Sequence, residues 1–227
     1  MRQWHSGTVG QCAAYHVSRI TFLVSRLSVL SVLSVVVAGG AVLACAGDSP
    51  AAGSLRGTVL AEPWPKPEFT LTRTDGRSFD FKKDTEGYVT LLFFGYTHCP
   101  DICPVHMANL GAVLHKLPPG SAGQVRVVFV TTDPQRDTPE RLRKWLDNFD
   151  HRFIGLAGSL DSVNAIQRRI GLAPAMLIPG DGDDYTMGHA AQIIAYTKDD
   201  LAHVVYPFGT RQEDWAHDLP ILITGNR

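Results

Sequence analysis

The stretch Tyr88-Val-Thr-Leu-Leu-Phe-Phe-Gly-Tyr-Thr-His-Cys-Pro-Asp-Ile-Cys-Pro104 contains the change of pattern that decides the fold. Tyr88 to Phe94 is a run of β-branched, aromatic and leucine residues, which is typical of a strand covered on both faces. Pro104 suits the first turn of a helix, and apolar residues follow it at helical spacing. The stretch therefore predicts a buried strand, a turn that carries Cys99 and Cys103, and a helix.

The rest of the chain repeats strand and helix signals in an order that indicates the fold class. Further strands are expected at 69–72, 78–81, 125–130, 154–157, 191–196 and 203–206. Further helices are expected at 139–149, 163–170 and 212–219, the last one ended by Pro220, with a loop over 172–188. Strand-helix-strand units require parallel pairing, whereas hairpins add antiparallel edges. The pattern predicts an α/β, thioredoxin-like fold with an N-terminal β-hairpin and a mixed central sheet flanked by helices.

The N-terminal region differs in composition from this domain. Residues 1–26 hold three arginines and no acidic residue, and the 18 residues of 27–44 carry no charge. A basic segment before an apolar one is typical of a secretory signal, although the length also suits a membrane anchor. We therefore expect residues 1–44 to be a signal peptide or membrane anchor, 45–66 to be a Pro/Ala/Gly-rich linker, and 67–227 to be the folded domain.

Cys45 lies at the end of the apolar segment, in Val42-Leu43-Ala44-Cys45. This run resembles the lipobox of bacterial lipoproteins, in which the cysteine is lipidated and becomes the first residue. The alternative is that Cys45 is only a small apolar residue at a cleavage site or in an anchor. In both cases the domain is expected to be tethered to the bacterial cell membrane and to face an oxidising, extracytoplasmic space.

The charge of the domain excludes two classes of partner. Without residues 1–44 the chain has 18 basic and 22 acidic residues, a net charge of −4 with neutral histidines. A mildly acidic domain lacks the basic surface that nucleic acid requires. It also lacks electrostatic attraction to anionic lipids, so the membrane is expected to be reached through the N-terminus alone.

Cys99 and Cys103 are the only thiols beyond Cys45. A helix N-terminus lowers the pKa of a thiol, and the thiolate is the form that binds metal and attacks disulfides. The pair is thus either a redox couple or part of a metal site, and a disulfide between the two is within reach. Two thiolates favour Cu(I), while an added imidazole would also accept Cu(II) or zinc.

One of the seven histidines beyond Cys45 would have to complete such a site. They are His98, His106, His115, His151, His189, His203 and His217. Next to Cys99, the side chain of His98 is expected to point away from its neighbour. One turn beyond Cys103, His106 is a possible ligand, but a solvated position on the helix is favoured. By contrast, His189 precedes the late hairpin, which a thioredoxin-like fold places beside the N-terminus of the first long helix.

Three motifs resemble those of one family. The runs Gly95–Pro104, Thr132-Asp-Pro-Gln-Arg-Asp-Thr-Pro139 and Tyr185-x-x-x-His189 have the order and separation found in Sco/SenC proteins. These are membrane-tethered, thioredoxin-like copper chaperones that help to assemble the binuclear copper centre of cytochrome c oxidase. The resemblance covers about residues 66–222 and implies the same fold and function for this chain.

The resemblance also implies a ligand set and partners. It assigns Cys99, Cys103 and His189 to copper, as Cu(I) or Cu(II), and it makes the copper-bearing subunit of cytochrome c oxidase the partner, with another extracytoplasmic protein as a copper donor. Asp133 and Asp137, in the second motif, would shape the loop near the metal. Asp137 could also pair with Arg136 or Arg141, but an exposed pair contributes little.

Two positions depart from the family pattern. Gly188 and Ala190 flank His189 where the family commonly has Asp and Ser or Thr, which removes a group that would orient the imidazole. Thr197-Lys-Asp-Asp200 replaces an Asp-x-x-Gly turn. The first departure is expected to lower the affinity for copper but not to abolish copper binding.

The main alternative function is a thiol-disulfide reductase that uses Cys99 and Cys103. Dedicated oxidoreductases of this fold usually have two residues between the cysteines, and they tend to carry a cis-proline where this chain has His189. A peroxiredoxin-like peroxidase is less favoured because its Thr-x-x-Cys setting is absent. We therefore expect a metallochaperone rather than an enzyme, with the redox chemistry as a second use of the same thiols.

Overall fold

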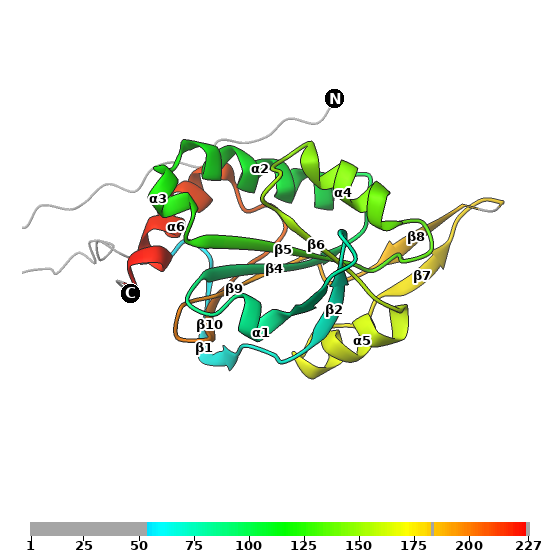
Figure 1. The fold of residues 1–227 in the computed structure, drawn as a ribbon, viewed down its shortest axis with the longest axis horizontal. Coiled ribbons are helices and arrows are strands. Elements are labelled where there is room, and N and C mark those ends of the chain that lie inside the picture. The colour runs from blue at the N-terminus through cyan, green and yellow to red at the C-terminus, as the bar shows by residue number, and fades with distance from the viewer. Residues whose placement is uncertain (1–53, 183, 226–227) are drawn as a thin grey trace, which may run out of the picture. The chain divides into compact units, whose positions relative to one another are not determined.

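A large mixed sheet lies between two layers of helices in the computed structural model (Figure 1). The structure describes residues 54–182 and 184–225. The predictions for residues 1–44 and for lipidation of Cys45 lie outside the described residues. Within them, no helix combines the length and the apolar character needed to cross a bilayer.

The main sheet has eight strands in the order β1-β10-β9-β4-β5-β6-β2-β3. They are β1 (Thr58–Pro65), β2 (Thr70–Arg73), β3 (Ser78–Asp80), β4 (Val89–Gly95), β5 (Val125–Thr131), β6 (Ile154–Ala157), β9 (Ile193–Tyr196) and β10 (Leu201–Tyr206). The central strands β4, β5 and β6 are parallel, and β9, β10, β1, β2 and β3 pair antiparallel. The predicted thioredoxin-like arrangement of a parallel centre and antiparallel edges is confirmed.

Helices cover both faces of this sheet (Figure 1). The first face carries α2 (Ile102–Lys116), α4 (Pro139–Asp147) and α6 (Gln212–Thr224), and the second carries α1 (Phe81–Asp84) and α5 (Leu160–Arg169). A four-residue helix, α3 (Pro119–Ala122), follows α2. Each face has its own apolar core, because alternate residues of the buried strands point to opposite sides. The functional motif lies at the carboxyl end of β4, where the chain enters α2.

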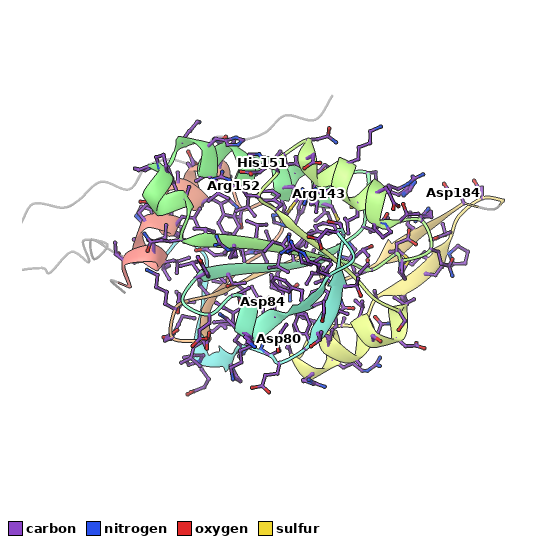
Figure 2. The ribbon with its side chains drawn as sticks, in the orientation of Figure 1. Asp80, Asp84, Arg143, His151, Arg152 and Asp184 are labelled. Atoms are coloured by element: carbon purple, nitrogen blue, oxygen red, sulfur yellow. The ribbon has the colours of Figure 1, made fainter. Side chains whose placement is uncertain are left out.

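The segment expected as a loop over 172–188 contains a second, two-stranded sheet. Strand β7 (Met176–Pro179) pairs antiparallel with β8 (Tyr185–Gly188), and Asp184 lies near the tip of this hairpin (Figure 2). The loop prediction is wrong because the Gly- and Asp-rich turn is confined to the hairpin tip and does not extend over the whole segment. The hairpin matters because β8 leads directly into His189.

Two segments that contain proline are more regular than predicted. Residues 58–65, expected as part of the linker, form an edge strand that pairs with β10, and edge strands tolerate proline. Helix α6 does not end before Pro220 but continues to Thr224. A proline inside a helix costs about 3 kcal/mol. Burial of Leu222 and Ile223 in the core favours continuing the helix despite that cost.

Candidate metal centre

Cys99 and Cys103 lie at the N-terminal end of α2. The helix begins at Ile102, so only Cys103 lies within it and Cys99 precedes it in the turn. The backbone N–H of Cys103 points at the sulfur of Cys99, with 3.5 Å between N and Sγ. Asp101, at the N-cap, makes no capping hydrogen bond with its side chain. The sulfur of Cys99 therefore takes the place of a capping acceptor for this helix.

His189 reaches the same place from the other side. Its Nε2 lies 3.8 Å from Cys103 Sγ, although the two residues are 86 positions apart in the sequence. The ring packs edge-on against Tyr96 and Phe93, with centroid distances of 5.6 and 6.0 Å. On the other ring nitrogen, Nδ1 donates to the carbonyl oxygen of Ala190 at 2.9 Å. This bond leaves Nε2 as the free acceptor, which is the form that binds metal.

The donor atoms of Cys99, Cys103 and His189 fit one metal ion. All three lie within 4.8 Å of one another. In a trigonal site with metal–sulfur bonds of about 2.3 Å and a metal–nitrogen bond of about 2.0 Å, sulfur and nitrogen are roughly 3.7 Å apart. The observed Sγ–Nε2 distance of 3.8 Å matches this value. Two thiolates and one imidazole form a soft set that suits Cu(I), Cu(II) and zinc.

The two thiols differ in acidity. A hydrogen bond from Cys103 lowers the pKa of Cys99 to about 3, against the opposing effect of burial and with further help from backbone N–H groups. The pKa of Cys103 is raised, first by burial and then by its role as donor to Cys99. The metal-free pair is thus a Cys99 thiolate next to a Cys103 thiol.

Asp137 links the loop between β4 and α2, which carries Cys99, to the end of strand β5 by hydrogen bonds. Its buried carboxylate accepts hydrogen bonds from the backbone N and the hydroxyl of Thr97, at 3.0 and 2.5 Å, and from the hydroxyl of Thr131 at 2.6 Å. The exposed ion pair that the sequence allowed for Asp137 is wrong, because the carboxylate lies under the loop and not on the surface. Its expected role in shaping the loop is consistent with these bonds.

Asp133 and Arg136 hold the β7–β8 hairpin. Asp133 accepts from Arg136 Nε and, at 2.8 Å, from the hydroxyl of Tyr185. The guanidinium of Arg136 lies over the ring of Tyr185 at 3.6 Å, and Nη1 donates to the backbone oxygen of Tyr185 at 3.0 Å. Strand β8 runs from Tyr185 to Gly188, directly before His189. Asp133 and Arg136, which hold Tyr185, therefore help to position the imidazole of His189 through this strand.

A second group of possible metal ligands consists of His98, Asp133 and Asp137, whose donor atoms lie within 4.8 Å of one another. The carboxylate oxygens there already accept hydroxyl, backbone and guanidinium hydrogens, and the charge of Arg136 opposes a cation. As expected, His98 turns outward, where Arg141 Nη1 is 2.9 Å from its Nε2. This cluster is therefore a set of satisfied hydrogen bonds beside the thiol site.

His106 is not the solvated residue that its helical position favoured. Its side chain is buried, with 1% exposed, and its Nε2 bonds to the backbone of Ala191. Sequence reasoning also missed Phe93, Tyr96 and Thr97, which line or brace the site. Nothing in the local pattern marks them, since apolar and hydroxyl residues at a strand end have many uses.

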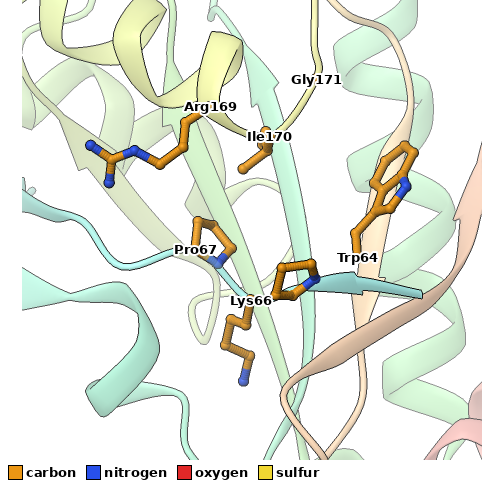
Figure 3. A pocket seen from close by; sticks show the side chains of 7 residues that line it. Trp64, Lys66, Pro67, Arg169, Ile170 and Gly171 are labelled. Atoms are coloured by element: carbon orange, nitrogen blue, oxygen red, sulfur yellow. The ribbon is translucent and has the colours of Figure 1, made fainter. Parts of the chain in front are cut away.

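An apolar hollow of about 410 Å³ between β1 and the end of α5 contrasts with this centre (Figure 3). It is lined by Trp64, Pro65, Lys66, Pro67, Arg169, Ile170 and Gly171. The amine of Lys66 instead forms an ion pair with Asp200, at 2.7 Å, and donates a hydrogen bond to the carbonyl oxygen of Thr85. The lining offers neither a thiol nor an imidazole, so it lacks the soft donor atoms that the thiol site brings together.

The fold and the site define a thioredoxin-like protein with a dithiol–histidine cluster whose donor atoms fit one metal ion. The SCO1/SenC family model matches residues 62–224. The chain therefore belongs to the SCO1/SenC family, which confirms the resemblance found in the motifs.

Relatives of known name and structure agree with this membership. The "Protein SCO1 homolog 1, mitochondrial" of Arabidopsis thaliana is 32% identical over 157 residues, which cover 69% of this chain and 44% of the relative. This chain spans about half the length of the curated relatives it matches. Among solved structures, copper-bound ScoI of Bradyrhizobium japonicum is 32% identical with a TM-score of 0.62, covering 70% of this chain and 99% of that one. The apo Sco1 of Thermus thermophilus is 29% identical with a TM-score of 0.64, covering 77% and 98%.

Proposed function

We propose that this chain is an extracytoplasmic copper-binding chaperone that delivers copper to, or prepares the thiols of, the binuclear copper site of cytochrome c oxidase. The observation that carries the proposal is the convergence of Cys99, Cys103 and His189 on one point. Copper is favoured as the ion because solved ScoI relatives hold it and because this soft donor set suits it. The oxidase and its copper-bearing subunit follow from the family resemblance.

The geometry supports copper as cargo that is held and then passed on. Cys99 sits half-buried at the turn while Cys103 is fully buried. An incoming thiolate or imidazole of a partner can therefore approach the metal from the side of Cys99. The Cys99 thiolate is ready to bind without first losing a proton, which favours capture of Cu(I) at neutral pH.

Copper titration of the reduced full chain tests this function. Wild type is expected to bind one Cu(I) and one Cu(II) per chain, the latter with a thiolate-to-copper absorption band. His189→Ala is expected to lose most of its Cu(II) affinity, and Cys103→Ser to lose both ions. His151→Ala changes an exposed histidine away from the site and serves as the matched control. Absence of copper binding by wild type, or unchanged Cu(II) binding by His189→Ala, would reject the proposal.

A second function is favoured by the split acidity of the thiols. The Cys99 thiolate would attack a disulfide of a partner and form a mixed disulfide, releasing one partner thiolate. Cys103 would then lose its proton and attack the sulfur of Cys99. This step releases the second partner thiolate and leaves the pair Cys99–Cys103 oxidised, so two electrons pass to the partner. The same chemistry would prepare the thiols of a copper site for metal.

Reduction of a model disulfide distinguishes this reductase role from copper binding. A reductase needs both cysteines and no imidazole, so His189→Ala is expected to retain the activity while Cys99→Ser and Cys103→Ser lose it. A loss of reduction in His189→Ala equal to the loss in the cysteine variants would contradict an independent reductase role.

We further propose that the domain is tethered to the bacterial cell membrane through its N-terminus, by lipid on Cys45 or by a retained helix. The proposal rests on the composition of residues 1–44 and on the run that ends in Cys45. Mass spectrometry of the mature protein is the test. A diacylated N-terminal Cys45 indicates the lipid, an intact leader indicates the helix, and cleavage without lipid contradicts both.

A further inference from the structure

His106 connects the two halves of the metal centre. It lies on α2, one helical turn beyond Cys103, and its Nε2 is 3.1 Å from the carbonyl oxygen of Ala191. A carbonyl oxygen only accepts, so Nε2 carries the proton of the neutral ring. Ala191 is two residues beyond His189. This hydrogen bond therefore adds to the Cys103–His189 contact a second link between α2 and the segment that holds His189.

Packing of the His189 ring and of Ala190 holds the segment between β8 and β9, but few hydrogen bonds fix its backbone. In the described chain, residues 189–191 make no backbone–backbone hydrogen bond, because β8 ends at Gly188 and β9 begins at Ile193. The bond from His189 Nδ1 to Ala190 is local and does not tie the segment to another element. Apart from the 3.8 Å contact between Cys103 Sγ and His189 Nε2, the bond from His106 is the polar tether of this segment to α2 among the described residues.

Aromatic contacts hold the ring of His106 in place. It packs edge-on against Phe93 at 5.2 Å and against Phe208 at 6.0 Å. Phe93 also contacts the ring of His189, so the two imidazoles share one neighbour. Phe208 lies in the loop before α6. Asn109, on α2, donates a hydrogen bond to the backbone oxygen of Thr210 in the same loop. The donor of His106 is therefore aimed at Ala191 by packing on both sides.

Burial makes a purely hydrophobic explanation of His106 inadequate. Its side chain is 1% exposed, and its Nδ1 has no hydrogen-bond partner among the described residues. A buried polar atom without a partner costs roughly 1–3 kcal/mol. A leucine or phenylalanine would fill such a position without that cost. The bond to Ala191 is the one polar contact that the imidazole gains here.

We infer that His106 is a positioning residue, which sets the distance between His189 Nε2 and the sulfurs through its bond to Ala191. The inference rests on the proposed copper-binding function. Groups that orient a metal ligand in this way typically change metal affinity about 10 to 100-fold. The effect falls on Cu(II), which needs the imidazole, more than on Cu(I), which the two thiolates hold.

Two variants of His106 separate the hydrogen bond from the packing. His106→Phe retains a ring between Phe93 and Phe208 but removes the donor, and His106→Gln retains an N–H donor of similar reach. Cu(II) affinity of the full chain is expected to fall about tenfold or more in His106→Phe and to return to near the wild-type value in His106→Gln. Cu(I) affinity is expected to change less. Cu(II) binding by His106→Phe with wild-type affinity and an unchanged absorption band would overturn the inference.

A measurement without copper keeps this inference distinct from the proposed function. Amide hydrogen exchange of residues 186–188 and 193–194, in the paired strands on either side of the tethered segment, is expected to be about tenfold faster in reduced, metal-free His106→Phe than in wild type and His106→Gln. His151→Phe controls for the added ring, and urea unfolding verifies that each variant is folded. Unchanged exchange in folded His106→Phe rejects the tether even if copper binds. Failure of wild type to bind copper rejects the proposed function and leaves the exchange result to decide the tether.

Discussion

Gly95 and Cys103 are in direct steric contact across the junction of β4 and α2. A Cβ atom at position 95 would stand 2.8 Å from Cys103 Sγ and about as close to the rings of Phe93 and Phe129. Real Cβ contacts do not come this near, so the buried sulfur occupies the space that the missing side chain leaves. The glycine is required by this close approach and not by its backbone angles, since its φ is not positive.

Gly95→Ala is therefore expected to displace the sulfur of Cys103 from its place facing His189. Overpacking of this kind costs about 1–3 kcal/mol in free energy of unfolding, and copper affinity is expected to fall at least about tenfold because one of the proposed ligands is displaced. Urea unfolding and copper titration measure the two effects. Gly120→Ala is the control, since a Cβ there meets nothing within 4 Å. Equal copper affinity in the two alanine variants would show that the contact is unimportant.

The sequence contained the architecture but only part of the site. Apolar runs such as Tyr88 to Phe94 predict buried parallel strands because burial on both faces leaves a strong pattern. Cys103 and His189 are 86 positions apart, and no local pattern shows that they meet. Their pairing followed from the fold and from the family resemblance.

Burial of polar residues was the least predictable property. Asp137 and His106 are 1% exposed, yet in the sequence each looks like an ordinary polar residue on a surface. What buries them is contact with distant elements, namely Thr97 for Asp137 and Ala191 for His106. Such contacts depend on the tertiary fold and leave no mark in the neighbouring residues.

The low pKa of Cys99 predicts an unusual pH profile of thiol reactivity. Because the pKa is lowered to about 3, the thiolate persists as the pH falls from about 8 to about 5. The rate of alkylation of the reduced, metal-free chain by iodoacetamide is expected to be nearly constant over this range. An ordinary thiol, with a pKa of about 8.5, would lose about tenfold in rate per pH unit. Peptide mapping with mass spectrometry assigns the label.

Variants of the two cysteines check the cause of this profile. Cys103→Ala removes the hydrogen bond that contributes most to the lowered pKa of Cys99, so its profile is expected to shift to higher pH. In Cys99→Ser, the buried Cys103 is expected to react slowly at every pH, because its own pKa is raised. A wild-type rate that rises about tenfold per unit through neutral pH would contradict the assignment of a thiolate to Cys99.

Asp137→Ala is expected to destabilise the domain strongly. The change leaves the backbone N–H and hydroxyl of Thr97 and the hydroxyl of Thr131 without their buried acceptor. A loss of about 3 kcal/mol in free energy of unfolding is expected from such a site. Asp147→Ala removes an aspartate whose side chain is 48% exposed and paired with Arg143, where about 0.5 kcal/mol is expected. Similar losses in free energy of unfolding in both variants would show that the buried hydrogen bonds of Asp137 do not stabilise the domain more than an exposed ion pair does.

An ion pair between Lys66 and Asp200 connects the end of β1 with the turn between β9 and β10. Asp200 has a φ of 59°, which usually favours glycine or asparagine, and its carboxylate lies 2.7 Å from the amine of Lys66. The side chain of Lys66 is fully buried. The ion pair thus explains why an aspartate stands where the family commonly has glycine.

A double-mutant cycle measures the strength of this pair. Asp200→Asn keeps a residue that tolerates positive φ but leaves the buried amine without its counter-charge, so a loss of about 2 kcal/mol in free energy of unfolding is expected. Combining Lys66→Met with Asp200→Asn is expected to restore much of this loss, because no uncompensated charge then remains buried. Asp200→Gly relieves the turn by about 0.5–1 kcal/mol yet also breaks the pair, and a net loss is expected. A glycine variant more stable than wild type would mean that relief of the turn outweighs the ion pair, which would contradict this account of the departure from the family pattern.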